Sequence, residues 1–192
     1  MFPKPRRARG SQLKRDSLGG QRNSRGGLRL GCRLLMATLF LMVGLPGAGK
    51  TTLAKQLERE RPALRLTPDD WITPLCGPNL AQAALDACRD PVESVQWLVA
   101  AQALTLGVDV VLDFGFWSQR ERNDFRDRAA AIGARSELRF LDIPLPVLAN
   151  RLAARNADLP AHAFHVSEAQ LQLWSSWFQP PTAEELQPRE LA

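Results

Sequence analysis

Eight consecutive residues near position 50 form the clearest chemical motif in the chain. They match the phosphate-binding pattern G-x-x-x-x-G-K-[ST], and in order they are Gly44, Leu45, Pro46, Gly47, Ala48, Gly49, Lys50 and Thr51. Glycines let the backbone curl so that its N–H groups point at a phosphate, and the positive end of the next helix stabilises the same anion. We expect this loop and Thr52 to bind ATP, with Lys50 on the β and γ phosphates and the Thr51 hydroxyl on Mg²⁺.

The residues on either side of the motif predict the elements that such a loop requires. Residues 39–43 are continuously apolar, which is typical of a strand buried on both faces of a parallel sheet. Residues 51–61 place Leu53 and Leu57 one helical turn apart and stop before Pro62, which favours an amphipathic helix. The motif therefore lies between a strand and a helix, and this context separates a nucleotide-binding loop from a simple glycine turn.

The rest of the chain alternates between short apolar runs and helical patterns. Further strands are predicted at 63–66, 108–112 and 138–142, and further helices at 91–106, 118–132, 147–155 and 167–178. Ser118 with Glu121, and Ser167 with Gln170, have the spacing of capping boxes at two of the helix starts. This alternation predicts an α/β fold, the three-layer sandwich of P-loop NTPases, with a parallel sheet and the ligand at the carboxyl ends of its strands.

Composition divides the 192 residues into one domain and two tails. Residues 1–35 hold ten basic residues and one acidic residue, with almost no apolar periodicity, so we expect a basic disordered tail. Two interpretations of this tail stay open: it contacts nucleic acid or another anionic surface, or it is an untranslated stretch upstream of a start at Met36. The expected P-loop domain is 36–180, followed by a C-terminal tail at 181–192.

Cysteine content and hydropathy predict a cytoplasmic location and no membrane partner. Cys32, Cys76 and Cys88 are odd in number and lack metal-ligand spacing, which fits free thiols in a reducing compartment. The apolar stretch 34–45 follows Arg33 and imitates a signal peptide, but cleavage near its end would cut the phosphate loop. The stretch is also too short to span a bilayer.

Four further sets of residues accompany the loop in a fixed order along the chain. These are Asp69 with Asp70 after the second strand, Asp113 at the end of the third, the turn Asp142, Ile143 and Pro144, and the pair Arg151 and Arg155. Together with the loop they resemble the small P-loop kinases, a group that includes the polynucleotide 5′-kinase domain of phage T4, zeta toxin and chloramphenicol phosphotransferase. The resemblance spans about residues 38–178. It implies a kinase that uses ATP and Mg²⁺ and closes a helical lid over the nucleotide.

The resemblance also implies roles for the charged residues. Asp69 corresponds to the general base that takes a proton from an acceptor hydroxyl, and in-line phosphoryl transfer needs such a carboxylate on the acceptor side. Asp70 is the neighbouring candidate, and the pair also fits a helix N-cap. Asp113 corresponds to a Walker B carboxylate that holds Mg²⁺ or orients the acceptor, with a turn aspartate as the alternative. Arg151 and Arg155 share one helix face and belong to the lid, where they neutralise charge on the transferred phosphoryl group, unless they form a solvated face.

The phosphoryl acceptor is the part of the function that the sequence leaves open. Residues 114–122 are similar to the substrate-facing segment of the family but more aromatic, which fits either a stacked ring or core packing. Residues 72–90 depart from the phage enzyme. We expect transfer of the γ-phosphate of ATP to a hydroxyl of a small molecule or a nucleic-acid 5′ end. The alternatives are an ATP-hydrolysing switch without an acceptor and a nucleic-acid-binding module that depends on the basic tail.

Overall fold

Apolar strands alternate with helices along the chain, as the sequence predicts. The computed structural model describes residues 36–77, 81–160 and 163–190, and the predicted basic tail 1–35 lies outside them. Within these residues the strands are β1 (Thr38–Val43), β2 (Ala63–Leu66), β3 (Asp109–Gly115) and β4 (Arg135–Phe140). The helices in the same residues are α1 (Lys50–Glu60), α2 (Pro68–Cys76), α3 (Gln82–Thr105), α4 (Gln119–Ala131), α5 (Leu145–Ala157) and α6 (Glu168–Trp177).

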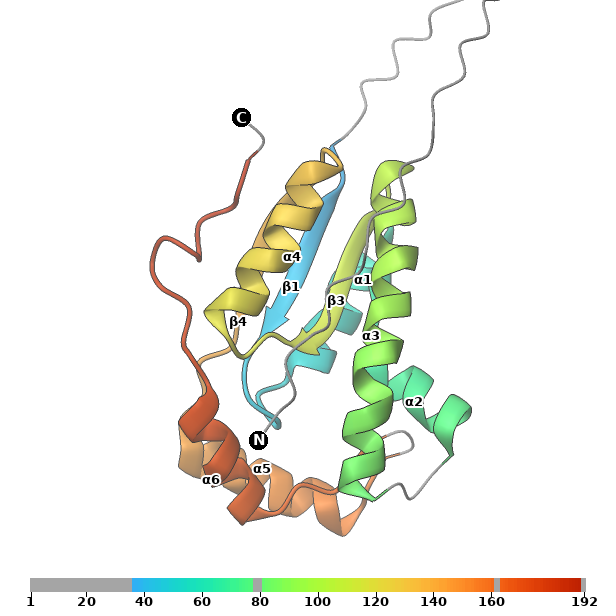
Figure 1. The fold of residues 1–192 in the computed structure, drawn as a ribbon. Helices are drawn as coiled ribbons and strands as arrows, with labels where there is room; N and C mark the ends of the chain where they lie inside the picture. Colours follow the sequence, from blue (N-terminus) through green and yellow to red (C-terminus); the bar gives the residue numbers. More distant parts are fainter. Residues whose placement is uncertain (1–35, 78–80, 161–162, 191–192) are drawn as a thin grey trace, which may run out of the picture. The chain divides into compact units, whose positions relative to one another are not determined.

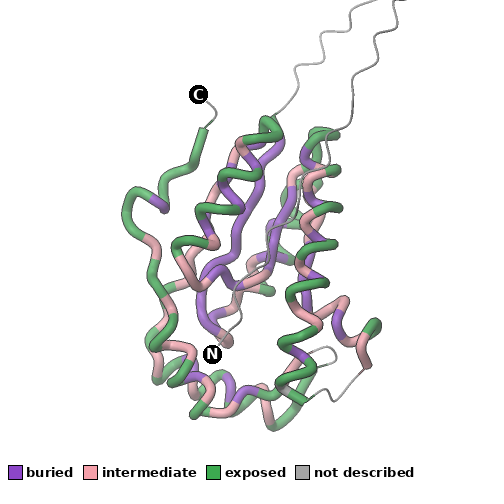
Figure 2. Tube along the Cα trace, in the orientation of Figure 1, coloured by how far each residue is buried: buried purple, intermediate pink, exposed green. Residues whose placement is uncertain are grey.

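The four described strands form one parallel sheet with the order β2, β3, β1, β4. All six residues of β1 are buried, because the strand lies inside the sheet and has neighbours on both faces. Figure 2 shows that β1 is buried along its length, whereas the helices alternate between buried and exposed residues. The parallel sheet confirms the predicted α/β fold, in which the carboxyl ends of the strands lie at one edge.

Helices cover both faces of this sheet. On one face α1 packs against Phe40, Met42 and Val111 through Ala54 and Leu57. The other face contacts α3 and α4, whose contributions to the core are Ala100, Leu104, Phe125 and Ala129. Figure 1 shows α1 behind the sheet, α3 and α4 in front of it, and α5 with α6 below the strand ends. The strand ends therefore point toward the phosphate loop, α5 and α6.

Several elements differ from the sequence prediction. β4 begins at Arg135 and ends at Phe140, where residues 138–142 were predicted, and α2 was not predicted as a helix. Two further boundaries differ for reasons of packing and pairing. The helix predicted from Pro91 begins instead at Gln82, so the proline lies inside a helix of 24 residues. Pro91 is exposed, whereas Leu85 and Val92 on either side of it pack against Ile72 of α2, and this packing outweighs the helix-breaking tendency of proline. The strand predicted to end at Leu112 continues to Gly115, because its pairing with β1 extends from Val43 to that glycine.

The longest helix raises the question of a membrane span. α3 has 24 residues, but neither it nor any other helix in the described part of the chain is long and apolar enough to cross a bilayer.

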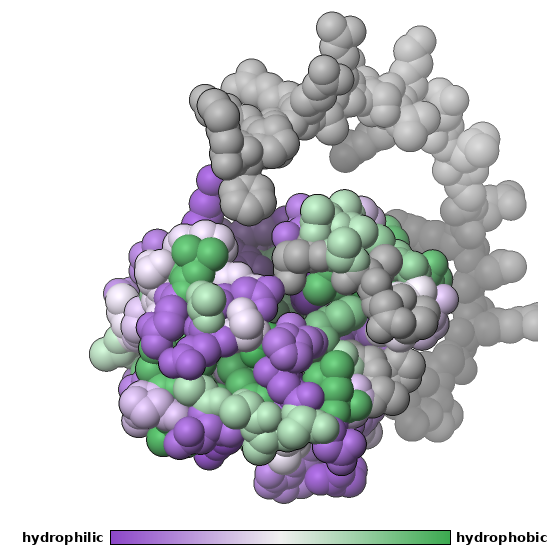
Figure 3. Space-filling model, turned by 90° about the horizontal axis from the view of Figure 1, so that it is seen from below, coloured by the Kyte–Doolittle hydropathy of each residue, from purple (hydrophilic) through white to green (hydrophobic). Residues whose placement is uncertain are grey.

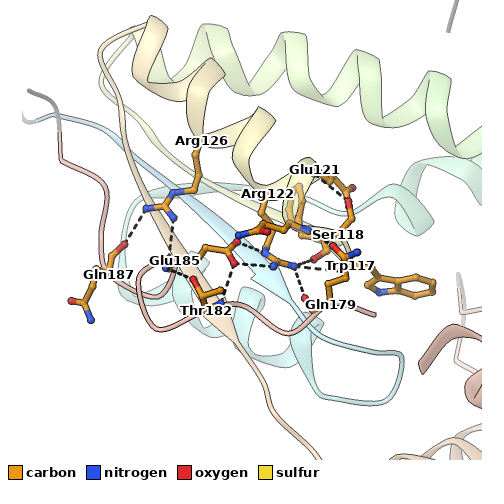
Figure 4. Close-up of polar contacts among 11 residues, drawn as sticks. Trp117, Ser118, Glu121, Arg122, Arg126, Gln179, Thr182, Glu185 and Gln187 are labelled. Carbon is orange, nitrogen blue, oxygen red and sulfur yellow. Dashed lines mark hydrogen bonds and ion pairs between the residues drawn. The ribbon is translucent and has the colours of Figure 1, made fainter. Parts of the chain in front are cut away.

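The predicted C-terminal tail is bonded to α4 through residues 185, 187 and 189, the last by an ion pair of 2.6 Å between Arg189 Nη1 and Asp127 Oδ1. The Arg122 side chain is fully buried and donates to both carboxylate oxygens of Glu185, with Nε to Oε1 at 2.7 Å and Nη2 to Oε2 at 3.1 Å. Its Nη1 donates to the carbonyls of Gln179 and Phe116, at 2.8 and 3.2 Å. Arg126 adds hydrogen bonds to the Glu185 and Gln187 carbonyls, both at 3.1 Å (Figure 4). Arg122 thus joins the C-terminal segment to the loop that follows β3.

Candidate functional site

The phosphate loop connects β1 to α1 and depends on its glycines. Gly44, Gly47 and Gly49 have φ angles of 146°, 81° and 98°, a region that favours glycine. A Cβ atom at Gly44 would lie 3.1 Å from the Leu141 carbonyl oxygen, and one at Gly47 would lie 3.1 Å from Leu152 Cγ. Gly49 is the N-cap of α1 and supplies no side-chain hydrogen bond, so the first N–H groups of the helix are available to an anion.

Lys50, the first residue of α1, is held by its own loop. Its Nζ donates to the Leu45 carbonyl oxygen at 3.0 Å. Burial of the ammonium group lowers the pKa of Lys50 to about 8, although the negative charges of Asp113 and Asp69 oppose this shift. Both carboxylates are therefore close enough to Lys50 to affect its charge.

Thr51 and Asp113 lie together at the end of the loop. The Thr51 hydroxyl donates to Asp113 Oδ2 at 2.5 Å, and the Thr67 hydroxyl lies 3.4 Å from the same oxygen. Asp113 is buried, and its Oδ1 has no hydrogen-bond partner in the described part of the protein. Burial raises the pKa of Asp113, against the hydrogen bond from Thr51 and the charge of Lys50.

The oxygen atoms of Thr51 and Asp113 fit Mg²⁺. This ion prefers hard oxygen ligands and is usually bound by one or two protein groups together with water and phosphate oxygens. The unpartnered Asp113 Oδ1 is such a ligand. No group of three or more His, Cys, Asp and Glu side chains that could hold a metal by itself occurs among the described residues. A phosphate-dependent magnesium site agrees with both observations.

Asp69 and Asp70 are adjacent in sequence but face different partners. Both lie in the first turn of α2. Asp69 Oδ1 accepts a hydrogen bond of 2.9 Å from Arg89 of α3, whereas Asp70 Oδ2 accepts one of 3.0 Å from Arg65 of β2. The charge of Asp69 affects the pKa values of Lys50 and Asp113. The charge of Asp70 has no comparable effect on either group. The Asp69 carboxylate therefore lies within electrostatic range of Lys50 and Asp113.

Arg151 and Arg155 of α5 reach different parts of the site. Arg151 is exposed, and its Nη1 lies 3.4 and 3.5 Å from the carbonyl oxygens of Gly47 and Ala48 in the loop. Arg155 is half-buried and donates from Nη2 to the Phe164 carbonyl oxygen at 2.9 Å. Burial lowers the pKa of Arg155, and the charge of Asp69 opposes that shift. One arginine thus contacts the loop, and the other is near enough to Asp69 to interact with its charge.

The aromatic segment after β3 divides between core and site. Phe114 and Phe116 pack on Phe125 inside the core, with ring centroids 5.9 and 5.1 Å away, so core packing explains both of them. Trp117 differs, because it lies near Lys50 across Gly115. A Cβ atom added at Gly115 would lie 3.1 Å from Trp117 Nε1 and 3.7 Å from Lys50 Cε.

The end of the molecule that carries α5 and α6 shows hydrophobic and hydrophilic side chains side by side (Figure 3).

The comparison with protein families identifies this arrangement. Residues 39–181 match the family described as an AAA domain. The chain belongs to this family. No curated protein matches the chain in sequence.

Solved structures with the same fold include kinases. A chain of the Pnkp1/Rnl/Hen1 RNA repair complex has a TM-score of 0.61 at 20% identity, over 82% of this chain and 49% of that one. Kti12 from Chaetomium thermophilum, in complex with ADP-AlF3, has 0.58 at 14% identity, over 76% and 82% of the two chains. A gluconokinase from Sinorhizobium meliloti 1021 has 0.52 at 17% identity, over 82% of each.

These likenesses establish the fold of the AAA domain. It is a P-loop fold of the kinase type, which confirms the resemblance noted in the sequence. The chain spans about half of the length of the RNA repair protein, 49% in one structure and 46% in another.

Sequence reasoning missed Arg89 and Thr67, two residues that the AAA domain places beside the predicted ones. Arg89 is twenty positions from its partner Asp69, and Thr67 is 46 positions from Asp113. Arg89 lies in the segment 72–90, which departs from the phage enzyme, and no motif marked it. Thr67 is the N-cap of α2, so a helix prediction starting at Pro68 would have drawn attention to it.

Proposed function

We propose that this protein is an ATP-dependent kinase that transfers the γ-phosphate of ATP to a hydroxyl group of a small molecule or of a nucleic-acid 5′ end. The observation that carries the proposal is a second carboxylate near the loop lysine. Asp113 accepts the Thr51 hydroxyl, whereas Asp69 lies on another element and still affects the pKa of Lys50. A site that only binds ATP needs the first carboxylate. Phosphoryl transfer also needs a group that orients the attacking nucleophile, and Asp69 would take that role.

The donor half of the site would hold ATP and Mg²⁺. The loop 44–51 and Thr52 would bind the phosphates, and Lys50 would exchange the Leu45 carbonyl for β and γ oxygens. Thr51 and Asp113 would hold Mg²⁺, which neutralises charge on the phosphates when it is bound. Arg151 and Arg155 would add positive charge from α5 as the lid closes. Because the reaction consumes ATP, we place the protein in the cytoplasm.

The acceptor half would use Asp69. As the acceptor oxygen forms a bond to the γ-phosphorus, the bond between that phosphorus and the β-γ bridging oxygen breaks and ADP leaves. The acceptor hydroxyl proton passes to the Asp69 carboxylate and later to water. Lys50 remains protonated and contacts the transferred group. A gluconokinase and a chain of an RNA repair complex among the similar structures support both small-molecule and nucleic-acid acceptors as classes to test.

The experiment is a transfer screen with γ-labelled ATP over alcohols, antibiotics, nucleosides and oligonucleotides. A kinase places the label on an acceptor, and Asp69→Asn loses the labelled product while it keeps ATP binding. Label found only in inorganic phosphate, with every acceptor class present, would support the switch alternative and contradict the proposal.

A further inference from the structure

The acceptor side of the site contains an arginine that joins two carboxylates. Arg89 lies on α3, and its Nη2 donates to Asp69 Oδ1 of α2 at 2.9 Å. Its Nη1 lies 3.7 Å from Oε1 of Glu93, one turn later on the same helix. The guanidinium therefore uses different nitrogens for the two carboxylates: a hydrogen bond that orients Asp69 and a longer ion pair with Glu93.

This cluster is partly withdrawn from water. The side chains of Arg89 and Asp69 are 32% and 37% exposed, and that of Glu93 is 19% exposed. Burial raises the pKa of Glu93 to about 7, with the charge of Arg89 opposing the shift and that of Glu121 adding to it. Burying a carboxylate so that its pKa rises costs folding stability, and residues with strongly shifted pKa values cluster at functional sites.

Three cations surround Asp69, and one of them hydrogen-bonds to it. Lys50 of α1 and Arg155 of α5 interact with the Asp69 charge, as does the carboxylate of Asp113 on β3. Arg89 is the hydrogen-bond donor, to Oδ1. In the described residues the structure gives no side-chain hydrogen bond to the other oxygen, Oδ2. The charge around Asp69 is therefore shared, but its orientation depends on Arg89.

We propose that Arg89 is the positioning residue of the acceptor base: it binds Asp69 Oδ1, leaves Oδ2 to accept the hydroxyl proton, and is itself held by Glu93. The proposal rests on the proposed function, because it concerns the same proton transfer. Arg89 acts through Asp69 and touches neither ATP nor the reacting phosphorus.

The test compares Arg89→Gln with the wild-type protein, using the acceptor that the transfer screen identifies. The kcat for transfer should fall about 10- to 100-fold, the scale expected when a reacting group is misplaced by about 1 Å. The Kd for ATP should change much less than kcat. No hydrogen bond or ion pair joins Arg89 to the phosphate loop in the described residues, although its charge contributes to lowering the pKa of Lys50. Arg89→Lys should recover part of kcat, since a lysine keeps the charge but not the fork. Arg59→Gln, at an exposed position in the last turn of α1, is the matched control.

A pH profile separates positioning from a general structural role. Arg89→Gln removes a positive charge beside the acceptor base, so the acid limb of kcat/KM should move to higher pH in this variant. The limb should stay in place in Arg59→Gln. Thermal unfolding is measured for each variant. If Arg89→Gln does not fold, Arg89→Lys and Glu93→Gln carry the same test, with a smaller loss of kcat expected for each.

Three outcomes would overturn the proposal, and they differ from one another. An unchanged kcat and acid limb in folded Arg89→Gln would show that Asp69 needs no such partner. A loss of ATP affinity as large as the loss of kcat would make Arg89 part of the donor site. If the wild-type protein labels no acceptor, the proposed function fails, and the positioning role fails with it.

Discussion

The charge of Lys50 gives the most direct test of the donor site, because it should titrate within an accessible pH range. Burial lowers its pKa from 10.5 to about 8 in the protein without nucleotide. Only the protonated form makes a charge-assisted contact with phosphate. Binding of ATP therefore favours the protonated form, and raising the pH above 8 should weaken the complex.

The size of this effect follows from the pKa. With a pKa of about 8, roughly nine in ten Lys50 side chains are charged at pH 7 and about one in ten at pH 9. The apparent Kd for ATP should therefore rise about tenfold over this range, which corresponds to about 1.4 kcal/mol. A lysine with its ordinary pKa of 10.5 would stay charged throughout and give no change.

The assay is titration calorimetry with ATP and Mg²⁺ at pH 7, 8 and 9 and constant ionic strength. Repeating the pH 8 measurement in two buffers of different ionisation enthalpy should reveal proton uptake on binding. Lys50→Arg is the control, because arginine stays charged and any titration of ATP itself remains in both proteins. A wild-type Kd that does not change between pH 7 and pH 9, with Lys50→Ala binding equally well, would refute the assignment of this lysine.

Three other predictions concern the acceptor side, the C-terminal segment and the basic tail. Asp69→Asn should reduce transfer by roughly 10²–10⁴-fold with ATP binding retained, whereas Asp70→Asn should do much less; equal losses in a transfer assay would contradict a specific base. Glu185→Ala should cost about 3–5 kcal/mol in urea unfolding, because it leaves the buried Arg122 charge unpaired; a loss below about 1 kcal/mol would mean that the pair is open to water. A protein that begins at Met36 should keep the melting temperature and activity of the full chain, since residues 1–35 have almost no apolar periodicity; a drop of several degrees on truncation would contradict this.

The sequence alone predicted the features that depend on neighbouring residues. The phosphate loop is one example, because its glycines, lysine and threonine act through a single continuous turn of backbone. The cap of α6 is another example. The Ser167 hydroxyl oxygen accepts a hydrogen bond from the Gln170 backbone N–H, and the Gln170 side-chain oxygen accepts one from the Ser167 backbone N–H. The alternation of strands and helices also predicted the α/β fold, because the hydrophobic pattern of each strand or helix can be recognised within about ten neighbouring residues.

Boundaries were less predictable where packing opposes local preference. Pro91 is a strong local signal for a helix start, yet α3 continues through it because Leu85 and Val92 both pack on α2. Asp113 marked the end of a strand by its charge, yet β3 continues to Gly115, which pairs with Val43 of β1 after a shift in register. In each case contacts with another element contribute more free energy than the local tendency costs.

The arrangement of charges in the site was decided by the tertiary structure. Two adjacent aspartates look equivalent in the sequence, but α2 turns Asp69 toward Arg89 and Asp70 toward Arg65. The hydrogen bond from the Thr51 hydroxyl to Asp113 likewise joins residues that are 62 positions apart in the sequence. These partners come from different elements and share no sequence period. Only the packing of the helices on the parallel sheet brings Asp69 to Arg89 and Asp70 to Arg65, so no pattern along the chain could have paired them. Thr51 and Asp113 are different, because their motifs already placed both at the expected Mg²⁺ site.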